Sequence, residues 1–269
     1  MRSLPRLLTV GDAMLDVTVD PGAGTHGARV HVRAGGTAVN AALAAARAGA
    51  KSLAAGCVGS DDAAAALRAA LAAGGAGDAL AADLDAPTGT VVRVGGALHV
   101  DRGANARLAP THVPSPDGAA VLVSGFALLH ADSAAAGRAA LAAGGWTLAT
   151  GGSPGLAARG GRGAYAGARV LVVNAAEAEA LTGARPDDAA RELARAHEVA
   201  CVTLGAEGAV LAAGDELVRA APPAALVTRR RDVGGAGDAF AAVLLLELAS
   251  GAPFEAALRA ACAAGAAAP

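Results

Sequence analysis

The chain has 269 residues and a net charge of −2, with 22 basic and 24 acidic residues. This balance leaves no basic field that would attract nucleic acid or an anionic membrane surface, so neither is an expected partner. Hydrophobic residues make up 54% of the chain but aromatic residues only 2%, which predicts a core of Ala, Val and Leu and few rings on which bases could stack.

The length of the chain and its cysteines indicate the class of protein further. A chain of 269 residues is expected to fold as one large α/β domain, with or without a small appendage. Cys57, Cys201 and Cys262 are far apart, odd in number and set in apolar surroundings, which predicts buried free thiols rather than a zinc site or a disulfide framework. The first residues lack the long apolar core of a signal peptide. We therefore expect a cytoplasmic protein.

The N-terminal segment predicts a short strand at 7–10 that ends at Gly11. Asp12 and Asp16 follow it directly. Open α/β sheets bind their ligands just beyond the carboxyl ends of strands, so both carboxylates are candidate binding groups. Asp16 suits the binding of hydroxyl groups, and the alternative is an aspartate that only stabilises a turn.

Two stretches predict small antiparallel pieces outside the main sheet. Residues 17–19 and 30–33 alternate with period two around a Pro/Gly/Thr loop, as strands with one buried face do. Residues 90–94 and 97–100 are joined by Gly95 and Gly96, a hairpin signal. Arg102 follows this second hairpin.

A glycine pair opens the next predicted helix, which runs to about Gly49. Gly35 and Gly36 would let a ligand approach the backbone closely, and Asn40 lies one turn into the helix. A hydrogen bond within the core is an equally good explanation for the Asn40 amide. A strand at 52–58 and a helix at 62–73 follow.

From residue 119 onward, buried strands alternate with helices. The predicted elements are strands at 121–123, 146–149, 170–173 and 200–203, helices at 133–143 and 253–265, and a hairpin at 210–212 and 216–218. This alternation is typical of a parallel sheet with crossover helices. Asn174 and Glu177 follow one of the strands with the spacing of a capping box. That structural explanation competes with a role for Glu177 in metal binding.

A glycine-rich stretch near the end of the chain carries the strongest chemical signal. Gly234, Gly235 and Gly237 surround Ala236, and Asp238 follows where an apolar helix begins. Backbone N–H groups of such a turn, added to the positive end of the helix, form a phosphate site. A carboxylate beside that site suits acceptance of a proton from an attacking hydroxyl. The alternative is a tight connection with an aspartate near the N-cap; the catalytic interpretation predicts a phosphoryl transferase.

Taken together, these stretches resemble the ribokinase-type (PfkB) family of carbohydrate kinases over nearly the whole chain. The two main signatures are 35–40 and 232–238, and similar intermediate motifs occur at 56–61, 103–105, 174–177 and 203–208. The resemblance implies an α/β, three-layer ribokinase-like fold with a central mostly parallel sheet and a small β lid. It implies a single kinase domain over 1–269, with lid strands drawn from about 17–33 and 90–101.

The resemblance also implies roles for individual residues. Asp238 matches the general base, and Gly235, Ala236 and Gly237 match the anion hole that holds the transferring phosphate. The substrate-binding positions are Asp16, Gly36 and Asn40, with Asp12 and Arg102 as further candidates. The nucleotide-binding positions are Asn174, Thr203, Gly205, Gly208, Gly237 and Ala263, the last with Gly265 near the adenine. Glu177 matches the motif that orders Mg²⁺, through water, and Asp232 is a candidate for a monovalent cation such as K⁺.

The implied activity is transfer of the ATP γ-phosphate to a hydroxymethyl group of a sugar or sugar-like small molecule. Met14 replaces an asparagine common in sugar kinases of the family, which resembles the nucleoside-kinase branch more closely. The scarcity of aromatics argues against a nucleoside, with Phe126 and Trp146 as candidate stacking partners. A catalytically weak binding or regulatory member is the other alternative, because the lid segment is short and Thr150 stands where an aspartate is common. The lid would allow a homodimer or an exposed monomeric lid.

Overall fold

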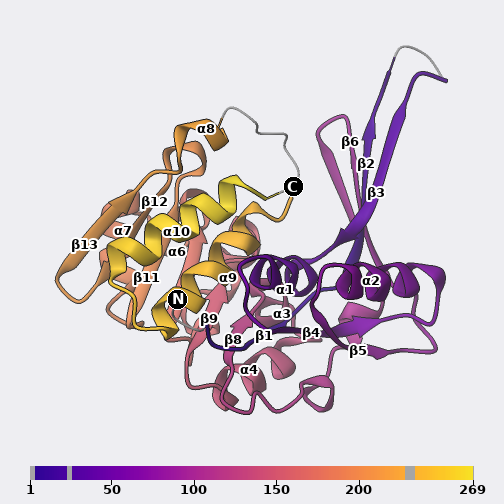
Figure 1. Cartoon of the computed structure of the whole chain (residues 1–269), viewed down its shortest axis with the longest axis horizontal. Coiled ribbons are helices and arrows are strands. Elements are labelled where there is room, and N and C mark those ends of the chain that lie inside the picture. The colour runs from indigo at the N-terminus through magenta and orange to yellow at the C-terminus, as the bar shows by residue number, and fades with distance from the viewer. Residues whose placement is uncertain (1–3, 23–25, 228–233, 269) are drawn as a thin grey trace.

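The computed structural model describes residues 4–22, 26–227 and 234–268, which form a body with a large sheet and a smaller sheet that projects from it (Figure 1). The strands of the large sheet are β1 (Leu7–Val10), β4 (Ser52–Val58), β5 (Gly77–Ala82), β8 (Ala120–Val123), β9 (Thr147–Thr150), β10 (Val170–Asn174), β11 (Val199–Thr203), β12 (Ala209–Ala213) and β13 (Glu216–Ala220). Their order across the sheet is β13-β12-β11-β10-β9-β8-β1-β4-β5.

The large sheet is mostly parallel, as predicted. Every neighbouring pair from β5 to β11 is parallel, and β12 and β13 add an antiparallel hairpin at one edge. The parallel strands are short apolar runs because both of their faces are covered. In β1, for example, Leu8 and Val10 join the core on one face while Leu7 joins the core on the other.

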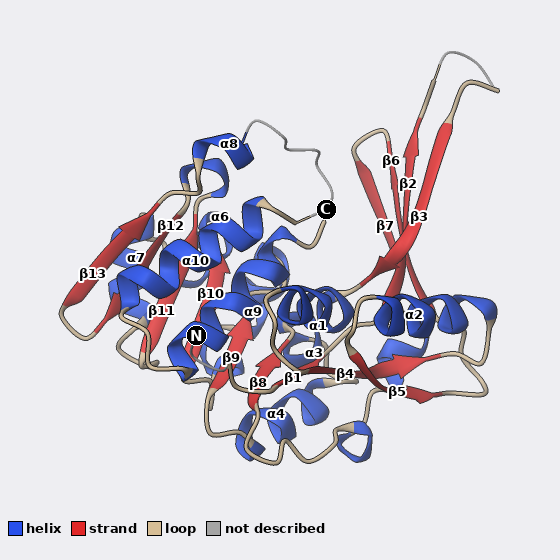
Figure 2. Cartoon of the chain, viewed as in Figure 1, coloured by secondary structure: helices blue, strands red, loops and turns tan. Residues whose placement is uncertain are grey.

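Helices cover both faces of this sheet and complete three layers (Figure 2). One layer holds α1 (Thr37–Arg47), α2 (Asp62–Ala73), α9 (Ala236–Ala249) and α10 (Phe254–Ala266). The other holds α3 (Gly125–Leu129), α4 (Ala134–Ala143), α5 (Pro154–Gly160), α6 (Ala175–Thr182) and α7 (Pro186–Leu193). A short helix, α8 (Ala224–Val227), lies between β13 and α9, and single 3₁₀ turns occur at Gly103–Arg107, Pro110–His112, Arg162–Tyr165 and Gly205–Glu207.

Helix α9 is buried on most of its surface, because it packs against α1, α10 and the sheet. Its residues from Ala239 to Leu246 are all buried, which explains why its sequence is apolar without a polar face. The helix therefore has little freedom to move. Its N-terminus is fixed at the carboxyl edge of the sheet.

The lid sheet, as we call the smaller sheet, has the strand order β3-β2-β6-β7. Its strands are β2 (Met14–Asp20), β3 (Arg29–Gly35), β6 (Gly89–Val94) and β7 (Ala97–Asp101). The two predicted hairpins do form outside the large sheet. Parallel pairing of β2 with β6, which the sequence analysis did not predict, joins them into one sheet.

Several other elements were not predicted from the sequence. The Ala/Gly tract before Ala82, to which no strand was assigned, forms β5 at the edge of the large sheet. Helices α3, α5, α7 and α8 were also missed. Cys57, Cys201 and Cys262 are buried free thiols, as predicted. Within the described ranges, no helix combines the length and the hydropathy that crossing a membrane requires.

Candidate active site

The N-terminus of α9 is the centre of the candidate site. Gly235 is its N-cap residue and has φ of 101°, a left-handed conformation that glycine adopts without steric cost. Ala236 and Gly237 then begin the helix, whose first N–H groups have no partner within it. These donors and the positive helix end favour an anion at this point. Asp238 is the third residue of the same turn.

Asp238 is held by the N-terminal part of the chain. The Asn40 Nδ2 donates a hydrogen bond to Asp238 Oδ2 at 2.9 Å, and the Thr37 side chain also bonds this carboxylate. The pKa of Asp238 is raised above the usual aspartate value because burial disfavours the charged form, and the bonds from Asn40 and Thr37 oppose this rise. The structure thus brings Asn40 and Asp238 together.

The glycine pair before α1 permits two close approaches. A Cβ atom on Gly36, which has φ of 86°, would lie 2.3 Å from the Asp12 carbonyl oxygen. A Cβ atom on Gly35 would lie 2.9 Å from Asp16 Oδ2. Larger residues here would push the loop after β1 away from α1. Gly35 and Gly36 therefore let the start of α1 approach the Asp12 carbonyl and the Asp16 carboxylate closely.

Asp16 is buried and paired with two arginines of the lid sheet. Arg33 Nη2 lies 2.9 Å from Asp16 Oδ2, and Arg93 Nη2 lies 3.7 Å from Asp16 Oδ1. Arg33 Nη2 also donates to the Gly234 carbonyl at 2.9 Å, which joins the lid to the entry of α9. The sequence analysis missed both arginines. The alternation of the lid strands was the available signal, since it places Arg33 and Arg93 on one face with Asp16.

Asp12 and Arg102 lie together and form an ion pair with each other. Arg102 Nη2 lies 3.5 Å from Asp12 Oδ1 and donates to Ser133 Oγ at 3.0 Å, while its Nη1 bonds Asp132 at 2.5 Å. Burial raises the pKa of Asp12, and the Arg102 charge opposes that rise. These contacts fasten the end of β7 to the body. They leave the pair less free to bind a ligand than the residues around Asp16.

A pocket of about 540 Å³, partly open to solvent, lies between α9, α10 and the β11–β12 connection. The predicted nucleotide residues Thr203, Gly205, Gly208 and Gly237 line it. Ala263 does not line this pocket. Instead Cys262, Gly265 and Ala266 do, because positions i, i+3 and i+4 share one face of α10 and Ala263 lies off that face.

A second pocket, of about 500 Å³, continues from the first toward Asp238. The two pockets share Thr203 and Gly237. The second is also lined by Thr37, Asn174, Glu177 and Asp238. An elongated ligand in both pockets would therefore have one end beside α10 and the other beside Asp238.

Glu177 forms the predicted capping box and also lines this second pocket. The Glu177 N–H donates to Asn174 Oδ1 at 2.9 Å, and the Asn174 N–H donates to Glu177 Oε2 at 2.8 Å. Gly151 lies against the carboxylate, since a Cβ there would be 2.1 Å from Glu177 Oε2. Burial raises the pKa of Glu177. The capping bonds thus fix a buried carboxylate at the wall of the pocket.

This arrangement fits Mg²⁺ bound together with phosphates. In the described part of the chain, no three His, Cys, Asp or Glu side chains gather into a metal site. Mg²⁺ usually retains several waters and uses one or two carboxylates plus substrate phosphates, so one buried carboxylate at the wall of a pocket that leads to the N-terminus of α9 is a suitable donor set. Asp232, the candidate for a monovalent cation, lies outside the described residues.

The two aromatic candidates for base stacking have different surroundings. Phe126 lines the second pocket and its ring stacks on that of His130, with centroids 6.5 Å apart. Trp146 is not at the site. It precedes β9 at the amino edge of the sheet, where the Arg169 guanidinium lies 3.9 Å from its ring centroid. The prediction for Trp146 was therefore wrong, because ligands collect at the opposite edge of such sheets.

Comparisons with known proteins identify the family and the fold. The family model described as "pfkB family carbohydrate kinase" matches residues 4–268. A fructokinase from Vibrio cholerae O395, solved with fructose, ADP and a potassium ion bound, is similar in structure with a TM-score of 0.84 and 26% identity, covering 99% of this chain and 92% of that one. An aminoimidazole riboside kinase from Salmonella enterica has a TM-score of 0.76 and 25% identity, covering 98% and 93%.

Two further similarities are more limited in what they show. The adenosine kinase from Sinorhizobium meliloti has a TM-score of 0.83 and covers 98% of this chain and 93% of that one, but at 22% identity it supports the fold alone. The bifunctional protein HldE from Nitrobacter winogradskyi is 43% identical over 112 residues, which are 39% of this chain and only 22% of that protein's length. With the family match over nearly its whole length, the chain belongs to the pfkB family of carbohydrate kinases and has the fold of its sugar and nucleoside kinases.

Proposed function

We propose that this protein transfers the γ-phosphate of ATP to a hydroxymethyl group of a sugar or sugar-like small molecule. The observation that carries the proposal is the position of Asp238. Its carboxylate lies in the first turn of α9, at the end of the two joined pockets, and is bonded by Asn40 from the other half of the site. In the proposal, the lid and the body act as one kinase unit.

Each group then has a defined task in the reaction. The Asp238 carboxylate accepts the proton of the acceptor hydroxyl, whose oxygen attacks the γ-phosphorus while the bond from that phosphorus to the ADP oxygen breaks. The N–H groups from Gly235 to Gly237 stabilise the charge on the transferring phosphoryl group. Asn40 and Thr37 keep the base oriented, and Asp16 binds hydroxyls of the acceptor. Thr203, Gly205 and Gly208 contact the nucleotide.

Glu177 would hold Mg²⁺ through a water molecule, and Asn174 would support it. The ion, when bound, offsets the negative charge of the phosphates. A monovalent cation such as K⁺ near Asp232 belongs to the same proposal. Replacing K⁺ by a large organic cation in the assay tests that part, because a bulky cation cannot occupy a small oxygen-lined site.

A nucleoside acceptor is the alternative within the same fold. Met14 favours it, since this side chain is buried and packs near Gly89 at the base of the lid sheet, where it offers apolar surface. Against it, aromatic residues make up only 2% of the chain, and Phe126, which lines the second pocket, already stacks on His130. A base would therefore have few rings on which to stack. We therefore favour a sugar.

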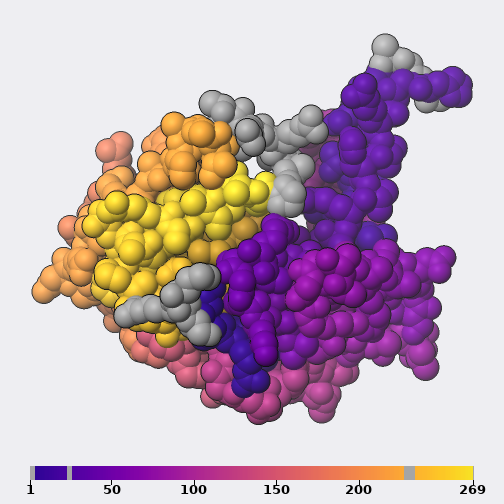
Figure 3. Space-filling view, viewed as in Figure 1, coloured from indigo at the N-terminus to yellow at the C-terminus, as the bar shows by residue number. Residues whose placement is uncertain are grey.

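We also propose that the lid sheet pairs with that of a second copy of the chain. Strand register places Val17, Val19, Val30, Val32, Val92 and Val94 on the face opposite Asp16. Val30 and Val32 are each 59% exposed, and in Figure 3 the outer part of the lid stands clear of the body. An exposed face rich in valine is typical of homodimer interfaces.

The direct test is acceptor-dependent ADP release. The purified protein is mixed with ATP, Mg²⁺ and a panel of sugars and nucleosides, and each compound's effect on ADP release and on Tm is measured. Stimulation by a sugar supports the proposal, and stimulation by nucleosides alone selects the alternative acceptor. If a compound raises Tm while none stimulates ADP release, the protein is a binding member of the family and the kinase proposal fails.

A further inference from the structure

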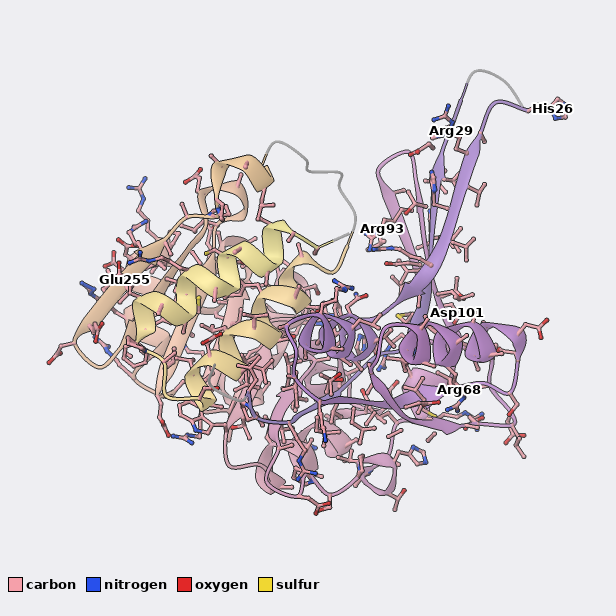
Figure 4. The ribbon with its side chains drawn as sticks, viewed as in Figure 1. His26, Arg29, Arg68, Arg93, Asp101 and Glu255 are labelled. Atoms are coloured by element: carbon pink, nitrogen blue, oxygen red, sulfur yellow. The ribbon has the colours of Figure 1, made fainter. Side chains whose placement is uncertain are left out.

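The inner face of the lid sheet, defined as the face that carries Asp16, has three arginines: Arg29 lies at its outer end, and Arg33 and Arg93 are the two beside Asp16. Asp16 pairs directly with Arg33 across β2 and β3, and Thr18 pairs with Arg93 across β2 and β6. Because side chains two residues apart on a strand share a face, Arg33, Asp16 and Arg93 point to the same side. Figure 4 shows the Arg93 side chain leaving the lid on the side that faces the body.

Both guanidinium groups reach the turn that leads to Asp238. A Cβ atom on Gly234 would lie 3.2 Å from Arg93 Nη2 and 3.3 Å from Arg33 Nη2. Arg33 also affects the pKa of Asp238 through its charge. The two arginines therefore lie between the residue expected to bind the acceptor and the turn that holds the base.

Few of the donors on these arginines are used within the described residues. Arg33 directs a single terminal nitrogen, Nη2, at both Asp16 and the Gly234 carbonyl. The contact recorded for Arg93 is its 3.7 Å ion pair with Asp16, beyond hydrogen-bond distance. A guanidinium has five N–H donors, and these side chains are 31% and 38% exposed. With respect to the described residues, donors on both arginines therefore have no partner and could bind a ligand.

Asp16 is less free than a simple hydroxyl-binding carboxylate would be. Each of its oxygens faces a guanidinium, which offsets its charge and competes for its lone pairs. The hydroxyls of a neutral sugar can accept hydrogen bonds from guanidiniums, but they bring no negative charge to pair with them. Two guanidiniums held by one carboxylate do suit a planar or tetrahedral oxyanion, which accepts paired N–H bonds from arginine.

We infer that the acceptor carries an anionic group, a phosphate ester or a carboxylate, and that Arg93 and Arg33 bind it. This inference rests on the proposed kinase function and specifies its substrate class. The hydroxyl to be phosphorylated then points to Asp238, while the oxyanion lies against the lid.

Binding measurements test the inference without turnover. Isothermal titration calorimetry, with saturating ADP to fill the nucleotide pocket, compares matched pairs: fructose with fructose 6-phosphate, ribose with ribose 5-phosphate, and glucose with gluconate. We expect the anionic member of at least one pair to bind roughly tenfold or more tightly than its neutral partner, as charge-assisted bonds allow. The preference should decrease as ionic strength rises. Comparing the sugar phosphates with gluconate shows whether the site binds a phosphate ester or a carboxylate.

Variants then identify the residues responsible. Arg93→Gln should bring the ratio of anionic to neutral affinity close to one, and Arg93→Lys should restore part of it. Arg29→Gln is the matched control, because Arg29 is an exposed arginine at the outer end of β3 (Figure 4) and should leave the ratio unchanged. Equal affinities within every pair in the wild type would overturn the inference, whether or not a variant folds.

The result also separates this inference from the kinase proposal. Anionic sugars that bind in an Arg93-dependent way without any ADP release would retain the inference and refute the kinase function. ADP release with neutral acceptors, without tighter binding of anionic sugars, would support the kinase function and refute the inference. If Arg93→Gln weakens ATP binding and affects every acceptor alike, the arginines serve the transferred phosphate and the inference is wrong.

Discussion

The Asn40 amide donates a hydrogen bond to the Asp238 carboxylate across 198 positions of sequence, at 2.9 Å. This contact joins the first turn of α1 to the first turn of α9, and so unites the two ends of the chain in one site. Gly235 lies beside it, since a Cβ there would be 3.3 Å from Asn40 Cγ. Asn40 therefore both orients the proposed base and packs under the N-terminus of α9.

Removing the Asn40 amide should alter the titration of the base as well as its position. In Asn40→Ala, we expect kcat to fall by roughly 10- to 100-fold, because a misplaced base loses much of its 10²–10⁴-fold contribution. The hydrogen bond also lowers the pKa of Asp238, so its loss should move the acid limb of the pH profile to higher pH. A purely structural role for Asn40 predicts no such movement; Thr37→Ser, which keeps the hydroxyl, is the control.

The wild-type pH profile should reflect the environment of Asp238. Burial raises its pKa above the usual aspartate value, and the base acts only when ionised. As pH falls through this raised pKa, kcat/KM should therefore decline at a pH above the ordinary range of aspartates. An acid limb that stays at the ordinary aspartate value would show that Asp238 is not the group that titrates.

Glu177→Gln should change the dependence on Mg²⁺. Glutamine can still accept the hydrogen bond from the Asn174 N–H, so α6 and its cap should remain folded. The loss of the carboxylate charge should raise the Mg²⁺ concentration needed for half-maximal activity several-fold, with partial recovery at high Mg²⁺. Glu179→Gln, an exposed glutamate on the same helix, is the control. An unchanged Mg²⁺ titration would leave Glu177 with a capping role alone.

The valine face of the lid should control association. Val30→Thr combined with Val32→Thr keeps β-branched residues in β3 but makes the exposed face polar. We expect the dimer measured by light scattering to dissociate at concentrations where the wild type remains paired. Leu98→Thr, on the opposite face and 55% exposed, should have no such effect. A wild type that is monomeric at high concentration would contradict the lid pairing.

Local signals made most of the body predictable. The sequences of β1, β8 and β10 are almost continuously apolar because both faces of the sheet are covered. The spacing of Asn174 and Glu177 predicted a capping box that the structure contains. Strand β5 was missed because Ala and Gly have weak strand propensity. Its pairing with β4 is decided by the rest of the fold.

The site was only partly predictable. The backbone of α9 and the approach of Gly36 to Asp12 follow from glycine positions that are visible in the sequence. The contacts of Asp16 with Arg33 and Arg93 do not, because they depend on the register of three lid strands and on the parallel pairing of β2 with β6. Alternation within each strand shows which side chains share a face, but it does not determine which strands pair or in which register.

Asp238→Asn tests the central claim most directly. Asparagine can keep the bond from Asn40 but cannot accept the proton. Because the pKa of Asp238 is raised in the folded state, the ionised carboxylate lowers stability as pH rises from the unfolded pKa to the folded pKa. At pH 7 the variant, which lacks this penalty, should therefore melt no lower than the wild type.

The decisive measurement is the rate of acceptor-dependent ADP release by Asp238→Asn at saturating ATP, with the best acceptor from the panel. Asp215→Asn, an exposed aspartate in the β12–β13 turn, is the control and should match the wild type. We predict a fall of roughly 10²–10⁴-fold with little change in ATP affinity, because the base acts in the transition state. A rate equal to that of the wild type would contradict the assignment of Asp238 as the base.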